Sequence, residues 1–124
     1  MIRRFVDPDA TFFFGSDEEV LAREAQGAIG FHVAGTRYAK RREGPTPIEA
    51  LVAEHCPTNA TLVRFAEIVR DADGAAGREQ HPEAIGLRLM TVAFPDVCDD
   101  DQEIVERSAF LYDAFYAALH KIVG

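Results

Sequence analysis

Residues 1–14 read MIRRFVDPDATFFF, and this opening stretch decides how we expect the chain to fold. Two adjacent arginines, Arg3 and Arg4, stand inside an apolar run that includes four phenylalanines. A terminus that stays in water gains nothing from so many large apolar side chains, because exposing them is unfavourable. We therefore expect this segment to belong to the core and to carry two permanent positive charges against it.

Two short apolar stretches in the first third of the chain predict strands. Residues 10–14 are apolar and aromatic between an Asp-Pro turn and Gly-Ser, and residues 28–33 have a similar character. Residues 37–45 are polar and end in Gly-Pro, which predicts a loop or an edge hairpin. The expected fold class is α+β. A small strand layer from residues 10–45 would be covered by about four to five helices, with the chain mostly helical after residue 46.

The helices have clear start and stop signals. Ser16 and Thr46 each stand three residues before a glutamate, which is the capping-box pattern, and they predict helices over 16–27 and 46–56. Further helices are expected over 60–72, 81–94 and 100–122. In the last of these, steps of three and four residues predict one apolar face: Ile104, Ser108, Leu111, Phe115, Ala118 and Ile122.

Length, composition and charge indicate one domain over residues 1–124, in a cytoplasmic protein. The chain is 48% hydrophobic and 27% charged, which is typical of a globular domain, and no apolar run is long enough to span a membrane. Its net charge of −8 argues against nucleic-acid binding through a general basic face. Residues 1–62 carry seven Lys and Arg against nine Asp and Glu, whereas residues 63–124 carry six against twelve. An anion-binding surface is therefore expected in the N-terminal half.

No metal, cofactor or catalytic motif is found. Cys56 and Cys98 lie far apart and match no metal or redox spacing, so we expect buried thiols. The aspartates at 99–101 are expected to cap a helix rather than to bind a cation. The histidines stand in separate elements without a second ligand at helical or hairpin spacing: His32, His55, His81 and His120. The residues alone name no enzyme and no cofactor.

Two basic clusters are candidate anion sites. Arg3 and Arg4 cannot share one face of a helix or strand, so one could pair with Asp7 or Asp9. In that case the other arginine is solvated. The alternative is an oxyanion clamp, because the guanidinium fork matches planar and tetrahedral anions. The second cluster, residues 37–42, has three possible roles. It is a charged edge that discourages strand pairing, the entrance of an anion-binding site, or a contact for an acidic partner.

A third group lies where the helix over 60–72 ends, in the sequence Arg70-Asp71-Ala72-Asp73. The aspartates there oppose the negative end of the helix dipole and so need a partner. An ion pair with Arg3 or Arg4 would provide one.

Four stretches, in order and at plausible spacing, resemble one known family: IRRFVDP at 2–8, AEIVRDAD at 66–73, PEAIGL at 82–87 and YDAFY at 112–116. The chain is similar over nearly its whole length to the chromate-resistance protein family. The resemblance is to the domain that forms the C-terminal half of chromate-responsive regulators and also occurs alone. It implies a sensor or regulatory role in chromate or oxyanion stress, with DNA binding left to the separate N-terminal half of those regulators.

The chain also departs from the family pattern. Family members usually open with a Cys-containing apolar stretch before the IRRF motif, so we expect the first element to be shortened here. A family His and Cys fall in the region of Lys40 and Pro45, and two further histidines fall on Gln102 and Arg107. Since these ligands are lost while cations are gained, the resemblance implies anion binding more than a metal or redox role.

We therefore expect a non-enzymatic domain that responds to a small oxyanion of the chromate or sulfate class and binds neither nucleic acid nor membrane. The expected ligand-binding residues are Arg3, Arg4, Arg70, Asp73, Tyr112 and Asp113. One alternative is an enzyme of unknown reaction in which the last four of these residues form an acid–base set in a cleft. Another is a degenerate protein-interaction module with residues 37–42 as its assembly surface. Homo-oligomerisation is left open.

Overall fold

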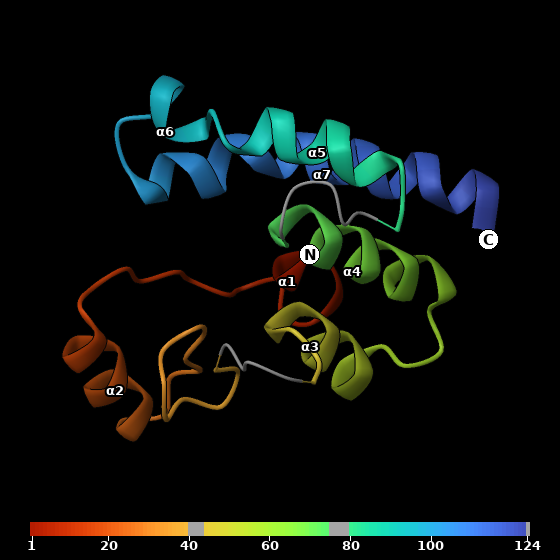
Figure 1. Ribbon diagram of the computed structural model, residues 1–124. Coiled ribbons are helices and arrows are strands. Elements are labelled where there is room, and N and C mark those ends of the chain that lie inside the picture. Colours follow the sequence, from red (N-terminus) through yellow and green to blue (C-terminus); the bar gives the residue numbers. More distant parts are fainter. Residues whose placement is uncertain (40–43, 75–79, 124) are drawn as a thin grey trace.

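The computed structural model describes residues 1–39, 44–74 and 80–123, and the part of the chain it describes is mostly helical (Figure 1). Its helices are α1 (Ile2–Phe5), α2 (Asp17–Ala25), α3 (Pro47–His55), α4 (Ala60–Asp73), α5 (Glu83–Thr91), α6 (Phe94–Val97) and α7 (Asp101–Val123).

Helix α4 is the centre of the fold. It packs on α3 on one side and on α5 and α7 on the other (Figure 1). The side chains of Leu62, Phe65 and Ile68 on α4 are 1%, 3% and 0% exposed. Burying such a side chain stabilises a fold by about 1.5–3 kcal/mol. These side chains, at steps of three residues, form the buried face of α4.

The core has two parts that meet along α4. One holds Phe65 and Ile68 with residues of α5 and α7, among them Leu87 and Leu119. The other holds Val52 of α3 with Leu62 and Ala66 of α4, and partly buried residues of α1 and α7 pack against it: Met1, Phe5 and Tyr116. The short helix α1 is thus attached to the core by Met1 and Phe5.

The helix starts were predicted well. Ser16 and Thr46 both form the predicted capping boxes with the glutamates three residues later. Asp100 accepts a hydrogen bond from the backbone N–H of Glu103, as expected for a residue that caps α7. The helix predicted over 81–94 is shorter, because α5 ends at Thr91 and the separate turn α6 begins at Phe94.

The predicted α+β class is wrong, because no strand layer forms in the described residues. Residues 10–14 and 28–33 both line one cavity of about 700 Å³, and no backbone hydrogen bond joins the two stretches. The pairing seen in the described residues is a single bridge between Phe31 and Tyr38. His32 has a φ of 65°, in the left-handed region that ends an extended run. Residues 10–14 thus have no paired neighbour, and residues 28–33 have one only at the Phe31–Tyr38 bridge, which is too short for a strand.

The predicted apolar face of α7 is partly wrong. Ile122 is 79% exposed and Ala118 is also exposed, whereas Leu119 is 3% exposed. Tyr112 and Tyr116 contact the core instead. The reason is that tyrosine rings, which look polar in a sequence pattern, supply much of the contact area of α7.

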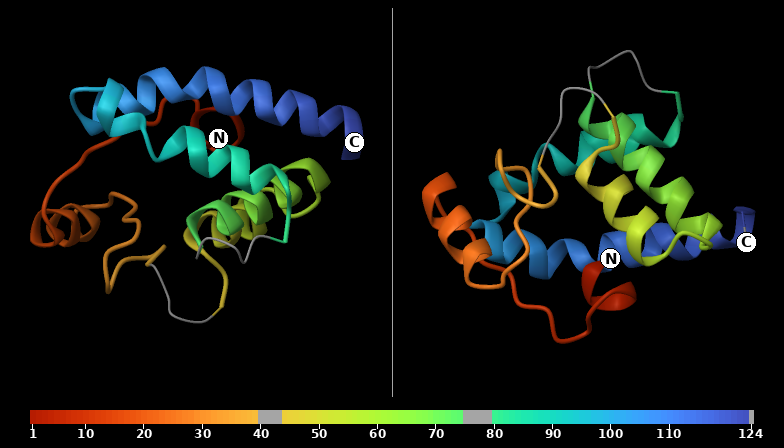
Figure 2. Two further views of the ribbon diagram at one scale, coloured as in Figure 1. Left: turned by 45° about the horizontal axis from the view of Figure 1, so that its top comes forward. Right: turned by 90° about the horizontal axis from the view of Figure 1, so that it is seen from below.

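The N-terminal third extends away from this helical core. Helix α2 lies to one side of the other helices in every view (Figures 1 and 2). Among residues 1–35, Gly30 alone is fully buried, and Phe13 and Phe14 are 44% and 46% exposed. The expectation that the whole opening segment is core therefore holds for α1 and fails for the three phenylalanines that follow it.

Candidate functional site

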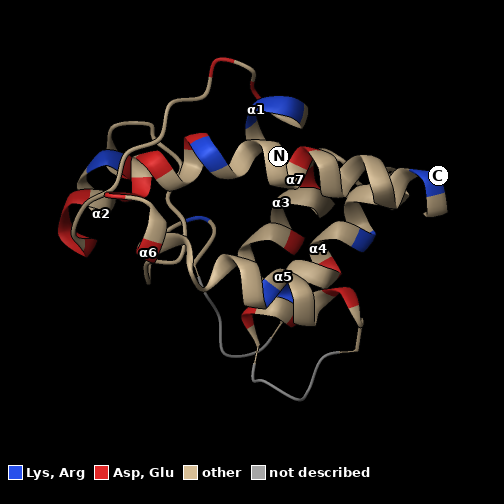
Figure 3. Ribbon diagram, turned by 90° about the horizontal axis from the view of Figure 1, so that it is seen from above, with Lys and Arg blue, Asp and Glu red and all other residues tan. Residues whose placement is uncertain are grey.

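Helix α1 lies beside α7 (Figure 3), and its residues Arg3 and Arg4 each contact a side chain of α7. Arg3 donates from Nη1 to Glu106 Oε1 at 3.1 Å and from Nε to the carbonyl oxygen of Ala10 at 2.9 Å. Arg4 donates from Nη1 to Asp113 Oδ1 at 3.2 Å. Neither arginine pairs with Asp7 or Asp9, so that reading is wrong. One turn of helix instead aims two adjacent arginines at two different acids of α7.

The two guanidinium groups contact acids that are about two helical turns apart. Their partners Glu106 and Asp113 are seven residues apart on α7, which at 1.5 Å per residue is about 10 Å along the helix axis. A guanidinium contacts an oxyanion at about 3 Å. We therefore treat each arginine as a separate contact for a tetrahedral oxyanion.

Arg4 lies among aromatic rings. Its guanidinium carbon is 4.7 Å from the ring centre of Tyr116 and 5.2 Å from that of Phe5. Those two rings are themselves in contact at 4.8 Å, and the hydroxyl of Tyr116 accepts a hydrogen bond from Asn59 at 3.2 Å. The Arg4 side chain nevertheless remains 44% exposed. The structure thus orients a charged group that water still reaches.

Tyr112 lies next to this group on α7 and is half-buried. Its ring packs edge-on against Phe65 at 5.9 Å, and with Asp113 it lines a very small cavity beside α1. Burial raises the pKa of Tyr112, and the nearby charge of Asp73 raises it further. The hydroxyl therefore stays protonated at neutral pH and can donate a hydrogen bond.

Arg70 lies in a different environment, between α3 and the residues before α5. It donates to Glu49 Oε1 at 2.9 Å and to Asp71 Oδ1 at 3.1 Å. Burial would lower the pKa of Arg70, but its hydrogen bond to Asp71 and the charge of Glu49 outweigh this and raise it. The sequence-predicted site therefore divides. Arg4 pairs with Asp113, Asp73 is near enough to Tyr112 to raise its pKa, and Arg70 is bonded to Glu49 and Asp71.

Asp71 is the centre of the group around Arg70. Its Oδ2 accepts from Nδ1 of His81 at 2.5 Å and from the backbone N–H groups of Gln80 and His81, each at 3.1 Å. Burial alone would raise the pKa of Asp71, but hydrogen bonds from His81, Arg70 and Gln80 together lower it. The partner that Asp71 needs is thus His81 with Arg70, not Arg3 or Arg4.

No pattern in the sequence predicts this network. His81 comes ten residues after Asp71, a separation that no helix or hairpin spacing explains, and Glu49 belongs to another helix. Only the packing of α3 and α5 on α4 brings them together. Arg88 of α5 also holds the end of α4, because it donates to the carbonyl oxygens of Asp71 and Ala72.

The second basic cluster is described only in part. Arg37 and Tyr38 both donate to the carboxylate of Glu54 on α3, and Tyr38 is 3% exposed with its ring stacked on Phe31. Arg37 and Tyr38 therefore hold their segment of the chain against α3. Residues 40–43, which include Lys40, Arg41 and Arg42, lie outside the described residues.

Metal ligands do not gather in the described ranges, where no three His, Cys, Asp or Glu side chains form a group that could hold an ion. Cys56 and Cys98 are half-buried free thiols rather than fully buried ones. None of the helices described has both the length and the apolar character needed to cross a bilayer.

Comparison with known proteins gives one further finding. A family model described as "ChrB, C-terminal domain" matches residues 1–119 of the 124-residue chain. No curated protein and no solved structure matches it.

Proposed function

We propose that this chain, which belongs to the family of ChrB C-terminal domains, responds to a small oxyanion, with Arg4 as its main contact. Membership links the chain to chromate resistance. The finer role rests on one observation: Arg4 is oriented by two aromatic rings and held by a single carboxylate contact, while it remains 44% exposed. We place this role in the cytoplasm, without nucleic acid or membrane as a partner.

The exposed ion pair is weak enough to be exchanged. Arg4 and Asp113 make one hydrogen bond rather than a two-pronged contact, and an exposed pair of this kind contributes about 0.2–1 kcal/mol. A guanidinium has five N–H donors, so most of those on Arg4 remain for an incoming anion. A dianion such as chromate or sulfate offers a higher charge than the carboxylate and can take its place.

Arg3 is a second and weaker anion contact. Two of its N–H donors are already used, by Glu106 and by the carbonyl oxygen of Ala10, and its guanidinium carbon lies 4.9 Å from the ring centre of Phe12. Because it lies about two helical turns away along α7, it would add long-range attraction rather than direct contact.

The geometry gives less support to an enzyme. The acid–base alternative needs Arg70, Asp73, Tyr112 and Asp113 in one cleft, but only Tyr112 and Asp113 line the small cavity beside α1. Arg70 is instead bonded to Glu49 and Asp71. A Tyr112 hydroxyl that stays protonated is a hydrogen-bond donor and not a ready base.

Direct binding tests the proposal. Chromate and sulfate are titrated into the protein by isothermal titration calorimetry at low ionic strength, with sodium chloride as the reference anion. We expect saturable heat for both dianions, which Arg4→Gln removes and Arg3→Gln reduces only in part. The matched control is Arg64→Gln, because Arg64 is 41% exposed and also faces one carboxylate. Equal heats for wild type and Arg4→Gln, or no heat with either dianion, would show the proposal to be wrong.

A further inference from the structure

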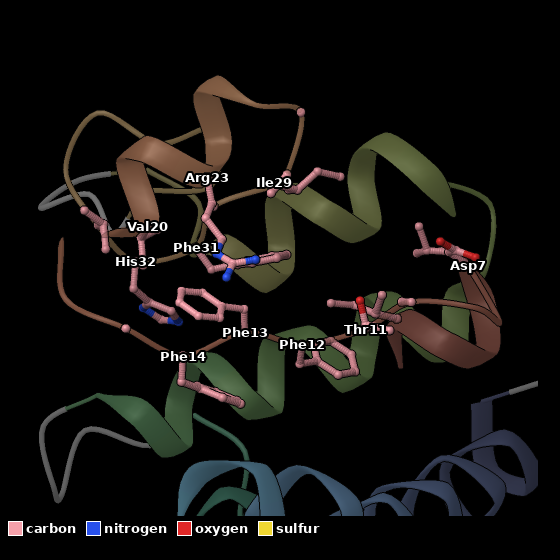
Figure 4. A pocket seen from close by; sticks show the side chains of 18 of the residues that line it. Asp7, Thr11, Phe12, Phe13, Phe14, Val20, Arg23, Ile29, Phe31 and His32 are labelled. Carbon is pink, nitrogen blue, oxygen red and sulfur yellow. The ribbon is translucent and has the colours of Figure 1, made fainter. Parts of the chain in front are cut away.

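A cavity of about 700 Å³ lies between residues 10–15, α2 and residues 27–33. Phe12, Phe13 and Phe14 run along one side of it, with Ile29 and Phe31 across from them (Figure 4). Arg4 does not line it, although Ile2 and Val6 on either side of Arg4 in the sequence do. The proposal for this groove therefore does not use Arg4.

The main chain along the groove has unused hydrogen-bonding groups. From Thr11 to Gly15, no backbone N–H or C=O group bonds to any residue that the structure describes. This segment runs as an extended trace from α1 to α2 (Figure 2). Its sequence, Thr-Phe-Phe-Phe-Gly, is rich in strand-forming residues and has neither the lysine nor the proline that commonly protects an edge.

The side chains along the groove are left partly uncovered. Phe13, Phe14 and Ile29 are 44%, 46% and 47% exposed. A contiguous apolar patch of this kind is typical of a binding surface, because covering it is favourable.

The charges around the groove define what can cover it. Thr11–Gly15 is uncharged, but exposed acids flank it on both sides, with Asp7 and Asp9 before it and Asp17 and Glu18 after it. Asp101 at the start of α7 also lines the cavity. The ends of the groove are therefore negative, and an occupant with positively charged ends is complementary to them.

Two arginines contact the phenylalanines of this segment: Arg3, which is paired with Glu106, lies 4.9 Å from the ring centre of Phe12, and Arg23 lies over Phe13. The guanidinium carbon of Arg23 is 3.7 Å from the ring centre of Phe13, and Arg23 has no carboxylate partner among the described residues. Its N–H groups face the groove (Figure 4) and can donate to the carbonyl oxygens of an added strand.

We propose that this groove binds an extended apolar segment of another protein, with basic residues at both ends, as a strand added along Thr11–Gly15. The unused backbone groups supply affinity, the phenylalanines supply the pocket for alternate side chains, and the acidic ends select basic flanks. A second copy of the chain fits less well. Antiparallel pairing of two such segments would set Asp9 of one copy near Asp17 of the other, and like charges opposite each other are destabilising.

Labelled peptides test this proposal on the full chain. Fluorescence anisotropy measures binding of the peptide KKVTVTVKK, of EEVTVTVEE with the same core, and of KKVTVTVKK in which all five core residues are N-methylated. We expect KKVTVTVKK to bind about tenfold more tightly than EEVTVTVEE at low salt. The N-methylated peptide should not bind, because it cannot donate backbone hydrogen bonds. Equal binding of the Lys-flanked and Glu-flanked peptides, or undiminished binding of the N-methylated one, would overturn the proposal.

Variants then locate the contact. Phe13→Asp and Ile29→Asp are each expected to abolish binding of KKVTVTVKK, and using two sites keeps the test valid if one variant folds poorly. Phe110→Asp on α7 is the matched control, because Phe110 is 82% exposed and distant in sequence from the groove. The pair Asp9→Lys and Asp17→Lys should reverse the preference in favour of EEVTVTVEE. Unchanged binding in both groove variants would overturn the proposal, as would a dimer that Phe13→Asp dissociates, since the occupant would then be a second copy.

Discussion

The guanidinium of Arg4 has three kinds of neighbour: an acid, two aromatic rings and water. The rings fix its plane, and Asp113 neutralises it at 3.2 Å without enclosing it. At the scale of single residues, Asp113 is therefore both the group that positions Arg4 and the competitor that an oxyanion must displace.

Removing that competitor should strengthen anion binding. Asp113→Asn keeps the shape of the side chain and removes its charge, so we expect the affinity for chromate to rise by about two- to fivefold at low salt, in line with the energy of an exposed ion pair. Titration calorimetry of Asp113→Asn beside wild type measures it. Glu106→Gln, which frees Arg3 instead, should change the affinity less. A weaker affinity in Asp113→Asn would mean that the carboxylate does not compete with the anion.

Asp71 is predicted to govern stability rather than anion binding. Asp71→Asn leaves donors from Arg70 and His81 poorly satisfied, so we expect the free energy of unfolding to fall by about 2–3 kcal/mol. Urea denaturation followed by circular dichroism measures this, with Asp96→Asn on exposed α6 as the control. An unchanged stability in Asp71→Asn would contradict the role given to this network.

The contribution of Asp71 to the free energy of unfolding should depend on pH. Because the pKa of Asp71 is lower in the folded chain than its usual 3.8, its contribution to stability is fully present above that value. It is lost as the pH falls below 3.8 and through the folded pKa. Wild type should therefore lose its advantage over Asp71→Asn in urea denaturation as the pH is lowered below 3.8, and a constant difference between the two would contradict the assignment.

At the scale of elements, α2 and α3 begin with the same capping box but differ in what they pack against. Thr46 starts a helix that buries Leu51 and Val52 against the core, whereas α2, started by Ser16, has no fully buried residue. The local chemistry is thus the same, and the tertiary context is not.

This contrast predicts different effects of one substitution. Thr46→Ala should lower the free energy of unfolding by about 1 kcal/mol, the usual contribution of a cap. Ser16→Ala should leave the urea midpoint of the whole chain nearly unchanged, because α2 contributes little to the cooperative core. Equal shifts of the midpoint in the two variants would show that α2 is more tightly integrated than its exposure indicates.

Local signals explain which elements could be predicted. The caps at Ser16, Thr46 and Asp100 act within one helical turn, so the sequence is sufficient to locate them. A strand depends on a neighbour elsewhere in the chain, and residues 10–14 and 28–33 do not pair with each other. Their composition therefore predicted strands that the described fold does not contain.

At the scale of the whole molecule, burial is concentrated in the part of the chain after residue 46. Apart from Thr36 and Tyr38, the buried hydrophobic and polar side chains belong to this helical part. The motifs that resemble the family lie largely on helices, so the family could be recognised from the sequence. The predicted fold class was wrong because it depended on the N-terminal third, where little is buried. A single domain over residues 1–124 remains a prediction.

Hydrogen exchange should reveal this division. Amides of residues 11–15 have no partner in the described residues, and those of 61–72 lie in the central helix α4, so we expect exchange to be faster in the first range by several orders of magnitude. Mass spectrometry after short deuterium labelling measures both ranges in one sample. Comparable protection in the two ranges would show that the N-terminal third is covered in solution.

The candidate site could be predicted only where adjacency in the sequence produced it. Arg3 and Arg4 were recognised as an unusual pair, and the proximity of Tyr112 and Asp113 follows from their being neighbours on α7. Arg70 was predicted to bind the anion together with them. The packing of α3 on α4 instead places Arg70 within hydrogen-bond distance of Glu49. Contacts between helices follow from the fold, which spacing along the chain does not encode.

The central claim, that Arg4 holds a small oxyanion, is tested most directly by where chromate perturbs the protein. Nuclear magnetic resonance spectra of backbone amides and arginine Nε–H groups are recorded while chromate is titrated into the labelled chain. We expect the largest saturable shifts at Arg4, Tyr112, Asp113 and Tyr116, with smaller shifts at Arg3 and none at Arg70. Shifts centred on Arg70, or no saturable shift at Arg4, would contradict the claim.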